Sequence, residues 1–351
     1  MLKVYDKSEK EAWNEIVKSF QNCDIYYLYE YAYSFMLHGD GDMHLIYFTY
    51  GEERLAYVVM QKDISNSNVF SDLLEAHVYY DWETPYGYGG PLVDEKLSIE
   101  AQQLFAKELK QYCRDHNIVS QFLRFHPLLK NFEMLPDLIE TRYLRDTIFM
   151  DTEVDVDGIM LNMDSKNRNM VRKAIKNDVT IVKKDITDLD EFVQMYNETM
   201  AKHEADEYYT FGWEYFDYLA KMSNNACVFY AMYEGKAISS AIIYYNDQYA
   251  HYHLSGSHAE YRKYSPSNLL LYEAACWAHK NGIKQFHLGG GMAPDDSLFG
   301  FKKQFNKNGR VPFVVGRTIF NHDAYEKLLT LREKKDKTFN RNNGFMIQYR
   351  R

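Results

Sequence analysis

The helical and strand-like patterns of this sequence follow one another in the same order twice. In each half, helical segments come first, then antiparallel strand patterns, then a further helix and a strand. No sequence-level repeat accompanies this order, so a duplication is inferred from the order of elements alone. The pattern predicts an α/β (α+β) protein with two similar domains, each a mixed, mostly antiparallel sheet flanked by helices.

Individual elements can be placed from hydrophobic periodicity and from their end signals. Helices are expected at residues 8–19, 26–37, 98–115, 157–177, 187–202, 212–223, 265–282, 296–304 and 323–335. Strands are expected at residues 43–50, 54–61, 119–127, 144–152, 180–185, three times within 226–256, and at 284–291 and 313–320. Residues 76–91 are interpreted as an aromatic and glycine-rich loop. No Pro/Ser-rich linker divides the chain, and the seam is expected near residue 150.

Length and charge exclude several classes of protein. The 351 residues suffice for about two domains. No apolar run approaches the roughly 18 residues that span a bilayer, so a cytoplasmic protein is expected, with a peripheral membrane contact left open. The net charge of −9 disfavours bulk binding to nucleic acid, although it permits a local basic groove. Aromatic residues make up 16%, which suits both half-buried sheets and clefts for polar ligands.

The region 253–291 is a strand, a loop, a helix and another strand. Ser265 is a good N-cap residue, and Pro266 suits the first helical position. A helix N-terminus favours an anion, and the preceding Arg262 and Lys263 add positive charge, so a phosphate or pyrophosphate would fit there. The plainer alternative is a capped helix that packs on a sheet. This layout resembles the acyl-CoA N-acyltransferase (GNAT) fold, in which the corresponding loop cradles the donor pyrophosphate, although residues 262–268 replace its usual glycine-rich signature.

A second resemblance covers nearly the whole chain. It rests on segments 86–91, 167–174, 195–200 with 208–209, 272–278 with 289–291, and 297–303. Their common order over about 300 residues resembles the Fem family of peptidoglycan-bridge aminoacyltransferases and their GNAT-fold acyltransferase relatives. The resemblance implies two GNAT-like domains, one formed by residues 1–150 with 315–351 and the other by residues 151–314. It also implies the shorter type of relative, which has no helical-hairpin arm.

The same resemblance implies transfer of an aminoacyl group from a charged tRNA to an amine of a cell-wall precursor. It places Phe301 and Lys302 at the reacting centre, where a fixed ammonium stabilises the oxyanion of the tetrahedral intermediate. The alternative is that Lys302 and Lys303 are solvated helix lysines.

Further binding residues are expected in two segments. Arg168, Arg172 and Lys176 form one basic helix face, which suits phosphates of tRNA or of an acceptor and is otherwise a solvated face. The loop that contains Tyr86 and Tyr88 belongs to the resemblance and is expected to bind substrate.

Three further points concern the acceptor and a possible metal site. A carboxylate of Asp81, Glu83 or Asp94 would suit an acceptor amine, and the sequence does not select one. The second N-terminal helix lacks the lysine with which Fem relatives often grip a nucleotide diphosphate, which argues against a UDP-linked acceptor. His251 and His253 share a strand face without an evident third ligand, so no metal site is expected.

We therefore expect an acyltransferase that acts on a small-molecule or lipid-linked cell-envelope precursor. The donor is aminoacyl-tRNA or, on the same fold, acyl-CoA with an amino sugar or similar acceptor, and no cofactor is bound permanently. tRNA is an open partner and DNA is not expected. A non-catalytic binding protein on an acyltransferase fold is the alternative of a different class.

Overall fold

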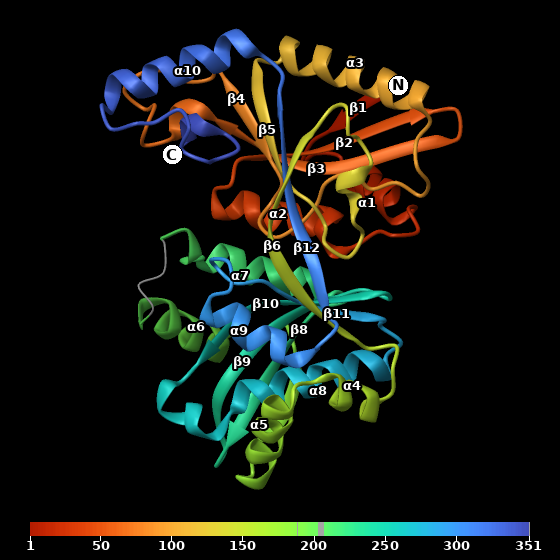
Figure 1. Cartoon of the computed structure of the whole chain (residues 1–351), viewed down its shortest axis with the longest axis vertical. Coiled ribbons are helices and arrows are strands. Elements are labelled where there is room, and N and C mark those ends of the chain that lie inside the picture. The colour runs from red at the N-terminus through yellow and green to blue at the C-terminus, as the bar shows by residue number, and fades with distance from the viewer. Residues whose placement is uncertain (188, 203–206, 351) are drawn as a thin grey trace. The chain divides into compact units, whose positions relative to one another are not determined.

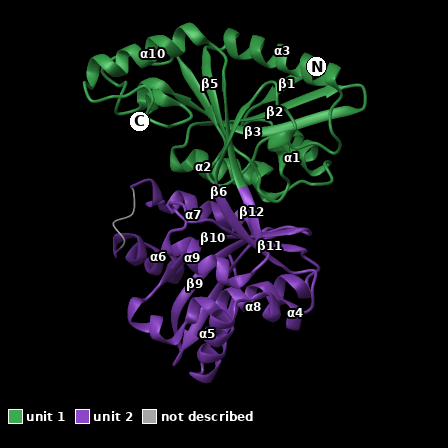
Figure 2. Ribbon diagram, viewed as in Figure 1, with its two compact units in different colours: residues 1–144, 313–351 green, residues 145–312 purple. Residues whose placement is uncertain are grey.

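The computed structural model describes residues 1–187, 189–202 and 207–350 (Figure 1). The chain divides into two compact units (Figure 2). Unit 1 comprises Met1–Leu144 and Phe313–Arg351, and unit 2 comprises Arg145–Pro312. The chain enters unit 2 within strand β6 (Glu140–Asp151) and returns to unit 1 within strand β12 (Arg310–Ile319), so unit 1 is built from two separate pieces of sequence.

The sheet of unit 1 has the strand order β1-β2-β3-β4-β5-β12. Its first five strands are β1 (Leu2–Tyr5), β2 (Asp42–Tyr50), β3 (Glu53–Asp63), β4 (Tyr80–Glu83) and β5 (Ile118–Arg124). Each neighbouring pair is antiparallel except β4 and β5, which run parallel. A parallel pair needs a crossover connection, and helix α3 (Ile99–Asp115) provides it.

The helices of unit 1 cover its sheet through their apolar faces. They are α1 (Lys10–Lys18), η1 (Ile25–Tyr27), α2 (Tyr29–His38), η2 (Ile64–Asn66), α3, η3 (Asn131–Glu133), α10 (His322–Lys335) and η8 (Gln348–Arg350). Ala101, Phe105 and Leu109 of α3 are fully buried in one hydrophobic cluster with the sheet. A second cluster brings α10 and the following segment onto β5.

Unit 2 repeats this topology. Its strand order is β6-β11-β10-β9-β8-β7. After β6 the strands are β7 (Thr180–Asp185), β8 (Ala226–Tyr233), β9 (Lys236–Tyr245), β10 (Tyr249–Ser257) and β11 (Gln285–Gly289). Again one pair, β10 and β11, is parallel, and helix α8 (Pro266–Lys280) forms the crossover between them. In both units the single parallel pair therefore lies next to the last strand of that unit's sheet, which is β12 in unit 1 and β6 in unit 2.

The helices of unit 2 lie between these strands along the chain. They are α4 (Val156–Asn162), α5 (Ser165–Lys176), α6 (Asp190–Lys202), η4 (Glu207–Tyr209), α7 (Trp213–Leu219), η5 (Ala220–Met222), η6 (Ala259–Tyr264), α8, α9 (Ser297–Lys302) and η7 (Lys303–Phe305). Helix α8 carries the largest share of the core, because its buried residues include Leu269, Leu270 and Ala275.

Three sequence-based expectations about elements were wrong. The helix expected over residues 26–37 is interrupted at Leu28, whose extended backbone separates η1 from α2. The segment expected as a loop over residues 76–91 contains β4, a four-residue strand with buried Asp81 and Glu83. The single helix expected over residues 157–177 is two helices. Met163 and Asp164 between them have extended backbone, and the fully buried Met163 joins the core of unit 2. Within the described residues, no helix is long and apolar enough to cross a bilayer.

Candidate functional site in unit 2

Strands β10 and β11 run side by side for three residue pairs and then separate. Their parallel register extends from Tyr249↔Gln285 to His251↔His287. Beyond this point β10 continues along β9 to Ser257, whereas β11 ends at Gly289 beside β6. The separation lies at the carboxyl ends of the parallel pair, which is where open α/β sheets usually bind ligands.

Lys302 lies next to this separation. Its Nζ donates a hydrogen bond of 2.8 Å to the carbonyl oxygen of Gly290, directly after β11. The same Nζ lies 5.5 Å from the centre of the Tyr252 ring on β10. The side chain thus contacts Gly290, which follows β11, and Tyr252, which belongs to β10.

The turn that precedes α9 fixes the position of Lys302. The carboxylate of Asp296 accepts hydrogen bonds from the backbone N–H groups of Met292, Ala293 and Phe299 at 2.6, 2.9 and 2.7 Å. Asp296 is therefore the N-cap of α9, and it connects the start of this helix to Met292 and Ala293, which follow the glycines 289–291. The adjacent Phe301 packs against the core of unit 2 and holds the end of the helix.

Burial changes the chemistry of Lys302. The residue is 8% exposed, whereas the neighbouring Lys303 is exposed to solvent. Desolvation disfavours the ammonium and lowers the pKa of Lys302 to about 8, and the charge of Asp296 opposes this shift. A lysine with a pKa near neutrality still carries its charge at pH 7, and it can also exchange a proton in the physiological range.

Tyr252 is the second polar group at the separation. Its hydroxyl donates a hydrogen bond of 2.6 Å to the Oγ of Ser255, across the point where the register of β10 with β9 shifts. Burial raises the pKa of Tyr252, so this hydroxyl remains protonated. The ring face toward Lys302 provides a weak cation–π contact.

The start of α8 differs from the capped helix that its sequence predicts. Ser265 has a left-handed backbone, with φ of 58°, and its side chain makes no capping hydrogen bond. Its hydroxyl instead lies 3.3 Å from the Sδ of Met170 on α5. Pro266 does occupy the first helical turn as expected, and Arg262 and Lys263 lie exposed on η6.

The corresponding helix of unit 1 shows what the start of α8 lacks. At α3, the N–H and hydroxyl of Ser98 donate to the two carboxylate oxygens of Glu53 at 2.5 and 2.7 Å. The chain thus supplies its own anion at the start of α3. No carboxylate of the described residues takes this place at α8, so the two helix starts are chemically different.

The basic helix α5 packs beside the start of α8. Besides the contact of Ser265 with Met170, Asn268 Nδ2 donates a 2.7 Å hydrogen bond to Oδ1 of the buried Asn167. Arg168 is half-buried and its Nη1 donates to the carbonyl oxygen of Met163 at 2.5 Å. Arg172 and Lys176 are exposed. Arg168 and Arg172 therefore lie on a helix that contacts the start of α8.

Tyr86 and Tyr88 belong to unit 1, on a loop that is fastened by buried side chains. Tyr31 Oη donates to the carbonyl oxygen of Tyr86 at 2.5 Å. Gly87 between the two tyrosines has φ of +89°, and a Cβ there would lie 2.7 Å from the Tyr26 ring, so only glycine fits. Both tyrosines are half-buried.

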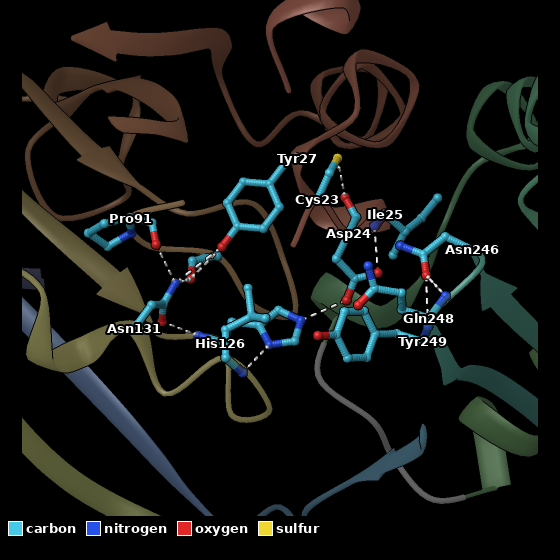
Figure 3. Close-up of polar contacts among 12 residues, drawn as sticks. Cys23, Asp24, Ile25, Tyr27, Pro91, His126, Asn131, Asn246, Gln248 and Tyr249 are labelled. Carbon is cyan, nitrogen blue, oxygen red and sulfur yellow. Dashed lines mark hydrogen bonds and ion pairs between the residues drawn. The ribbon is translucent and has the colours of Figure 1, made fainter. Parts of the chain in front are cut away.

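Asn131 fastens the far end of the same loop (Figure 3). Its Nδ2 donates to the carbonyl oxygens of Gly89 and Pro91 at 2.8 and 2.9 Å, and its Oδ1 accepts from the N–H of His126 at 3.0 Å. The His126 Nδ1 accepts from a backbone N–H, so Nε2 carries the proton that binds Asp24 at 2.7 Å. This buried pair and Asn131 make the loop a rigid element.

The three carboxylates left open by the sequence all have partners within unit 1. Asp81 accepts from the Arg350 Nε at 3.0 Å, and Glu83 from its Nη1 at 2.7 Å. Lys62 and the nearby arginines hold the pKa of Glu83 well below its ordinary value, against the opposing effect of burial. Asp94 pairs with Arg54 at 2.6 Å. Each has a structural ion pair.

Two histidines, one on β10 and one directly after it, also have protein partners. His253 Nε2 lies 2.7 Å from the hydroxyl of Tyr215, and burial lowers the pKa of His253 to about 3. His258 pairs with Glu198 at 3.2 Å. His253 is therefore neutral at physiological pH.

Comparison with known proteins agrees with this geometry. Residues 165–303 match the model of the acetyltransferase (GNAT) domain family. The matched segment contains α5, the parting strands, α8 and Lys302. A search of the curated proteins found no match.

Solved structures resemble the chain over nearly its whole length. FemX shares 15% identity and a TM-score of 0.68, with 93% of this chain and 99% of FemX covered. The C-terminal domain of a putative lysylphosphatidylglycerol synthetase from Agrobacterium fabrum shares 15% identity and a TM-score of 0.57, with 91% and 94% covered. L-PGS from Bacillus licheniformis shares 14% identity and a TM-score of 0.56, with 93% and 96% covered.

The chain therefore has the Fem-like fold of two GNAT-like domains, and residues 165–303 of its second unit match the acetyltransferase (GNAT) domain family. The predicted fold class, the resemblance and the assignment to the acyltransferases are confirmed at this level.

Sequence reasoning missed two residues around Lys302 and one at the start of α3. Tyr252 and Gly290 give no local signal, because one lies in an ordinary strand pattern and the other acts through its carbonyl oxygen. Glu53 was also missed, although a carboxylate in a hairpin and a serine before a helix are common patterns separately. Only the sheet brings Glu53 and Ser98 together.

Proposed function

We propose that this protein transfers an aminoacyl group from aminoacyl-tRNA to an amine of a cell-envelope precursor. The observation that carries the proposal is the buried Lys302 beside the parting strands of a GNAT domain. The Fem-like fold over nearly the full chain supports the aminoacyl donor. The precursor belongs to the peptidoglycan pathway or is a lipid-linked molecule, in a cytoplasmic reaction.

In this reaction the neutral acceptor amine attacks the ester carbonyl carbon of the donor. The carbonyl π electrons move to oxygen, and the attacking nitrogen becomes positively charged. The tetrahedral intermediate collapses with loss of the tRNA ribose oxygen, which takes up the proton that the nitrogen releases. Lys302, with Phe301 holding its helix, is positioned to stabilise the oxyanion with its ammonium. With a pKa of about 8 it is roughly nine-tenths protonated at pH 7.

The donor phosphates are assigned to the start of α8, where the chain supplies no carboxylate of its own among the residues described. Arg262, Lys263 and Ser265 precede this helix, and Arg168 and Arg172 belong to α5, which contacts the start of α8 through Met170 and Asn167. The Tyr86 and Tyr88 loop of unit 1 is assigned to the acceptor, because its fastening by Asn131 and Tyr31 keeps two half-buried rings in place.

A second candidate is an acyl-CoA-dependent N-acyltransferase that acts on an amino sugar or similar acceptor. The match of unit 2 to the acetyltransferase (GNAT) family favours it, because this fold generally uses acyl-CoA. The phosphate site at α8 would serve either donor.

The deciding experiment offers both donors to the purified full-length chain. Charged tRNA and acetyl-CoA are each incubated with a panel of peptidoglycan precursors, phosphatidylglycerol and amino sugars. Stoichiometric consumption of charged tRNA with a new aminoacyl product supports the proposal. Release of free CoA establishes the second candidate instead, and ligand binding without turnover of either donor identifies a non-catalytic binding protein.

A further inference from the structure

Three tyrosine rings gather on unit 2 beside η6, in a cluster formed by Tyr233, Tyr261 and Tyr264. Tyr233 and Tyr264 are stacked, with ring centres 4.7 Å apart and planes 27° apart. Tyr261 lies 6.1 Å from Tyr233 and 6.3 Å from Tyr264. All three are half-buried, with part of each ring packed on the core and part exposed.

Two lysines complete the cluster. Lys236 Nζ lies 5.3 Å from the centre of the Tyr261 ring, and Lys263 Nζ lies 5.0 Å from that of Tyr264. Adjacent aromatic rings with ammonium groups over them match the two needs of single-stranded nucleic acid, which are stacking surfaces for bases and cations for phosphates.

Basic side chains near the cluster lie on helix α5. Helix α5 contains five basic residues, Lys166, Arg168, Arg172, Lys173 and Lys176, and no acidic residue. It is joined to the start of α8 by the contacts of Asn268 with Asn167 and of Ser265 with Met170. A phosphate backbone that leaves the tyrosine cluster can therefore follow basic side chains, despite the net charge of −9 of the whole chain.

We propose that the tyrosine cluster binds the single-stranded 3′ end of the donor tRNA by base stacking, with Lys236 and Lys263 on its phosphates. The proposal rests on the aminoacyl-tRNA donor proposed above. The stacked pair of Tyr233 and Tyr264 and the tilted ring of Tyr261 give more than one stacking position, which suits consecutive bases, whereas CoA offers a single base. The cluster also has acidic neighbours, which are Glu234 beside Tyr233 and Glu260 on η6, so stacking rather than net charge provides most of the selectivity.

The test uses fluorescence anisotropy with two RNA hairpins that mimic an acceptor stem, one with a single-stranded 3′ overhang and one blunt-ended. Tyr264→Leu and Tyr233→Leu keep apolar packing and remove the stacking surface. Each is expected to weaken binding of the overhang hairpin by about 5- to 150-fold, as is usual for loss of one stacked base, and to leave the blunt hairpin unchanged. Tyr264→Phe keeps the ring and should bind almost as well as the wild type.

The matched control is Tyr50→Leu, because Tyr50 is a tyrosine of unit 1 that is 42% exposed on β2. Melting temperatures of all variants identify any change that reflects unfolding, and Tyr264→Phe then tests the ring in a folded protein. Unchanged binding of the overhang by both leucine variants overturns the inference, as does equal weakening for both hairpins. If the leucine variants lose affinity for CoA but bind the overhang hairpin normally, the cluster belongs to the site of a nucleotide donor, and this result also overturns the inference.

This result is separable from the proposed function. If the wild type consumes charged tRNA but the leucine variants bind the overhang normally, the donor is correct and the tyrosine cluster is not its binding surface. If the wild type consumes no charged tRNA, the proposed function itself fails.

Discussion

At the residue scale, Lys302 shows how a fold can maintain a reactive group at a cost in stability. The hydrogen bond to the Gly290 carbonyl oxygen and the Tyr252 ring replace only part of the hydration that an ammonium has in water. The lowered pKa is the measure of that deficit. The same burial that weakens the charged form increases the electrostatic effect of the charge on a nearby oxyanion, because the surroundings are less polar than water.

The pH dependence of turnover tests the role of this charge. Because the proposed role needs the ammonium, kcat of the wild type should fall as pH rises through about 8, the pKa of Lys302. Lys302→Arg keeps a cation at all accessible pH and should lose this descending limb, while Lys302→Ala should lower kcat by about 10²–10³. Steady-state rates at saturating donor and acceptor provide the measurement. A wild-type rate that does not fall above pH 8, with the same pH profile in Lys302→Arg, would contradict this role of the ammonium.

The stability of a Lys302→Met variant tests the cost of burial. The pKa of Lys302 is lower in the folded chain than the ordinary 10.5, so the unfolded chain binds more protons between about pH 8 and 10.5. The penalty is fully present below pH 8 and is relieved as pH rises across this window. Its size is on the order of 3 kcal/mol.

Lys302→Met should therefore unfold at higher urea concentration than the wild type at pH 7, and the difference should shrink toward pH 10. Lys303→Met is the control, because Lys303 is exposed and its replacement should leave the free energy of unfolding within about 0.5 kcal/mol of the wild type. If the Lys302→Met variant is instead less stable than the wild type at pH 7, the ammonium is well satisfied where it lies.

At the element scale, the sequence predicts those segments whose signals are local. Helix α3 has a serine cap and an apolar face, and both appear in the structure, where the Ser98 Oγ accepts from the Ala101 N–H at 3.2 Å. The strand β4 was missed because Asp81 and Glu83 are unfavourable strand residues by themselves. Their partner Arg350 lies 269 residues from Asp81 and 267 from Glu83 in the chain, so no local window contains the signal.

The candidate site follows the same rule. Resemblance to a family selects Lys302, but the carbonyl oxygen of Gly290 and the ring of Tyr252 that surround it depend on where β10 and β11 separate. The Ser265 cap failed because a left-handed backbone turns its hydroxyl away from the helix, and residue type alone does not reveal that conformation. Patterns therefore locate the elements, whereas the sheet determines which side chains meet.

The fastened loop of unit 1 gives a prediction at this scale. Asn131→Ala removes the two hydrogen bonds from Nδ2 to the Gly89 and Pro91 carbonyl oxygens. The Pro91 carbonyl oxygen loses its donor, whereas that of Gly89 keeps the N–H of His126 at 3.0 Å. The expected loss is about 2–4 kcal/mol in the free energy of unfolding. Because the loop carries Tyr86 and Tyr88, KM for the acceptor should rise more than KM for the donor.

Urea unfolding and steady-state kinetics on both substrates measure the two effects. Asn281→Ala serves as the control, because Asn281 is exposed and its side chain bonds to its own helix through the Trp277 carbonyl oxygen. Equal increases of both KM values would indicate a general loss of folded protein rather than a displaced loop.

At the scale of the whole molecule, the two units share a topology but differ in how the chain builds them. Unit 2 is continuous, and all six of its strands include residues between Arg145 and Pro312. Unit 1 depends on Phe313–Arg351, which supply most of β12, helix α10 and the residues around Tyr349. The order of synthesis therefore leaves unit 1 incomplete until the final segment is available.

A chain that ends at Pro312 tests this dependence. It lacks most of β12, the antiparallel neighbour of β5, and it lacks the apolar side chains that α10 packs onto Val119. It also leaves the buried Asp81 without its Arg350 partner, a type of loss that typically costs about 3–5 kcal/mol. Together, these losses approach the whole free energy of unfolding of an ordinary domain.

Hydrogen exchange measures the effect of this truncation. We expect unprotected amides in β4 and β5, while β8, β9 and β10 of unit 2 stay protected and serve as the internal reference. Protection of β5 equal to that in the full chain would show that unit 1 folds without its second piece.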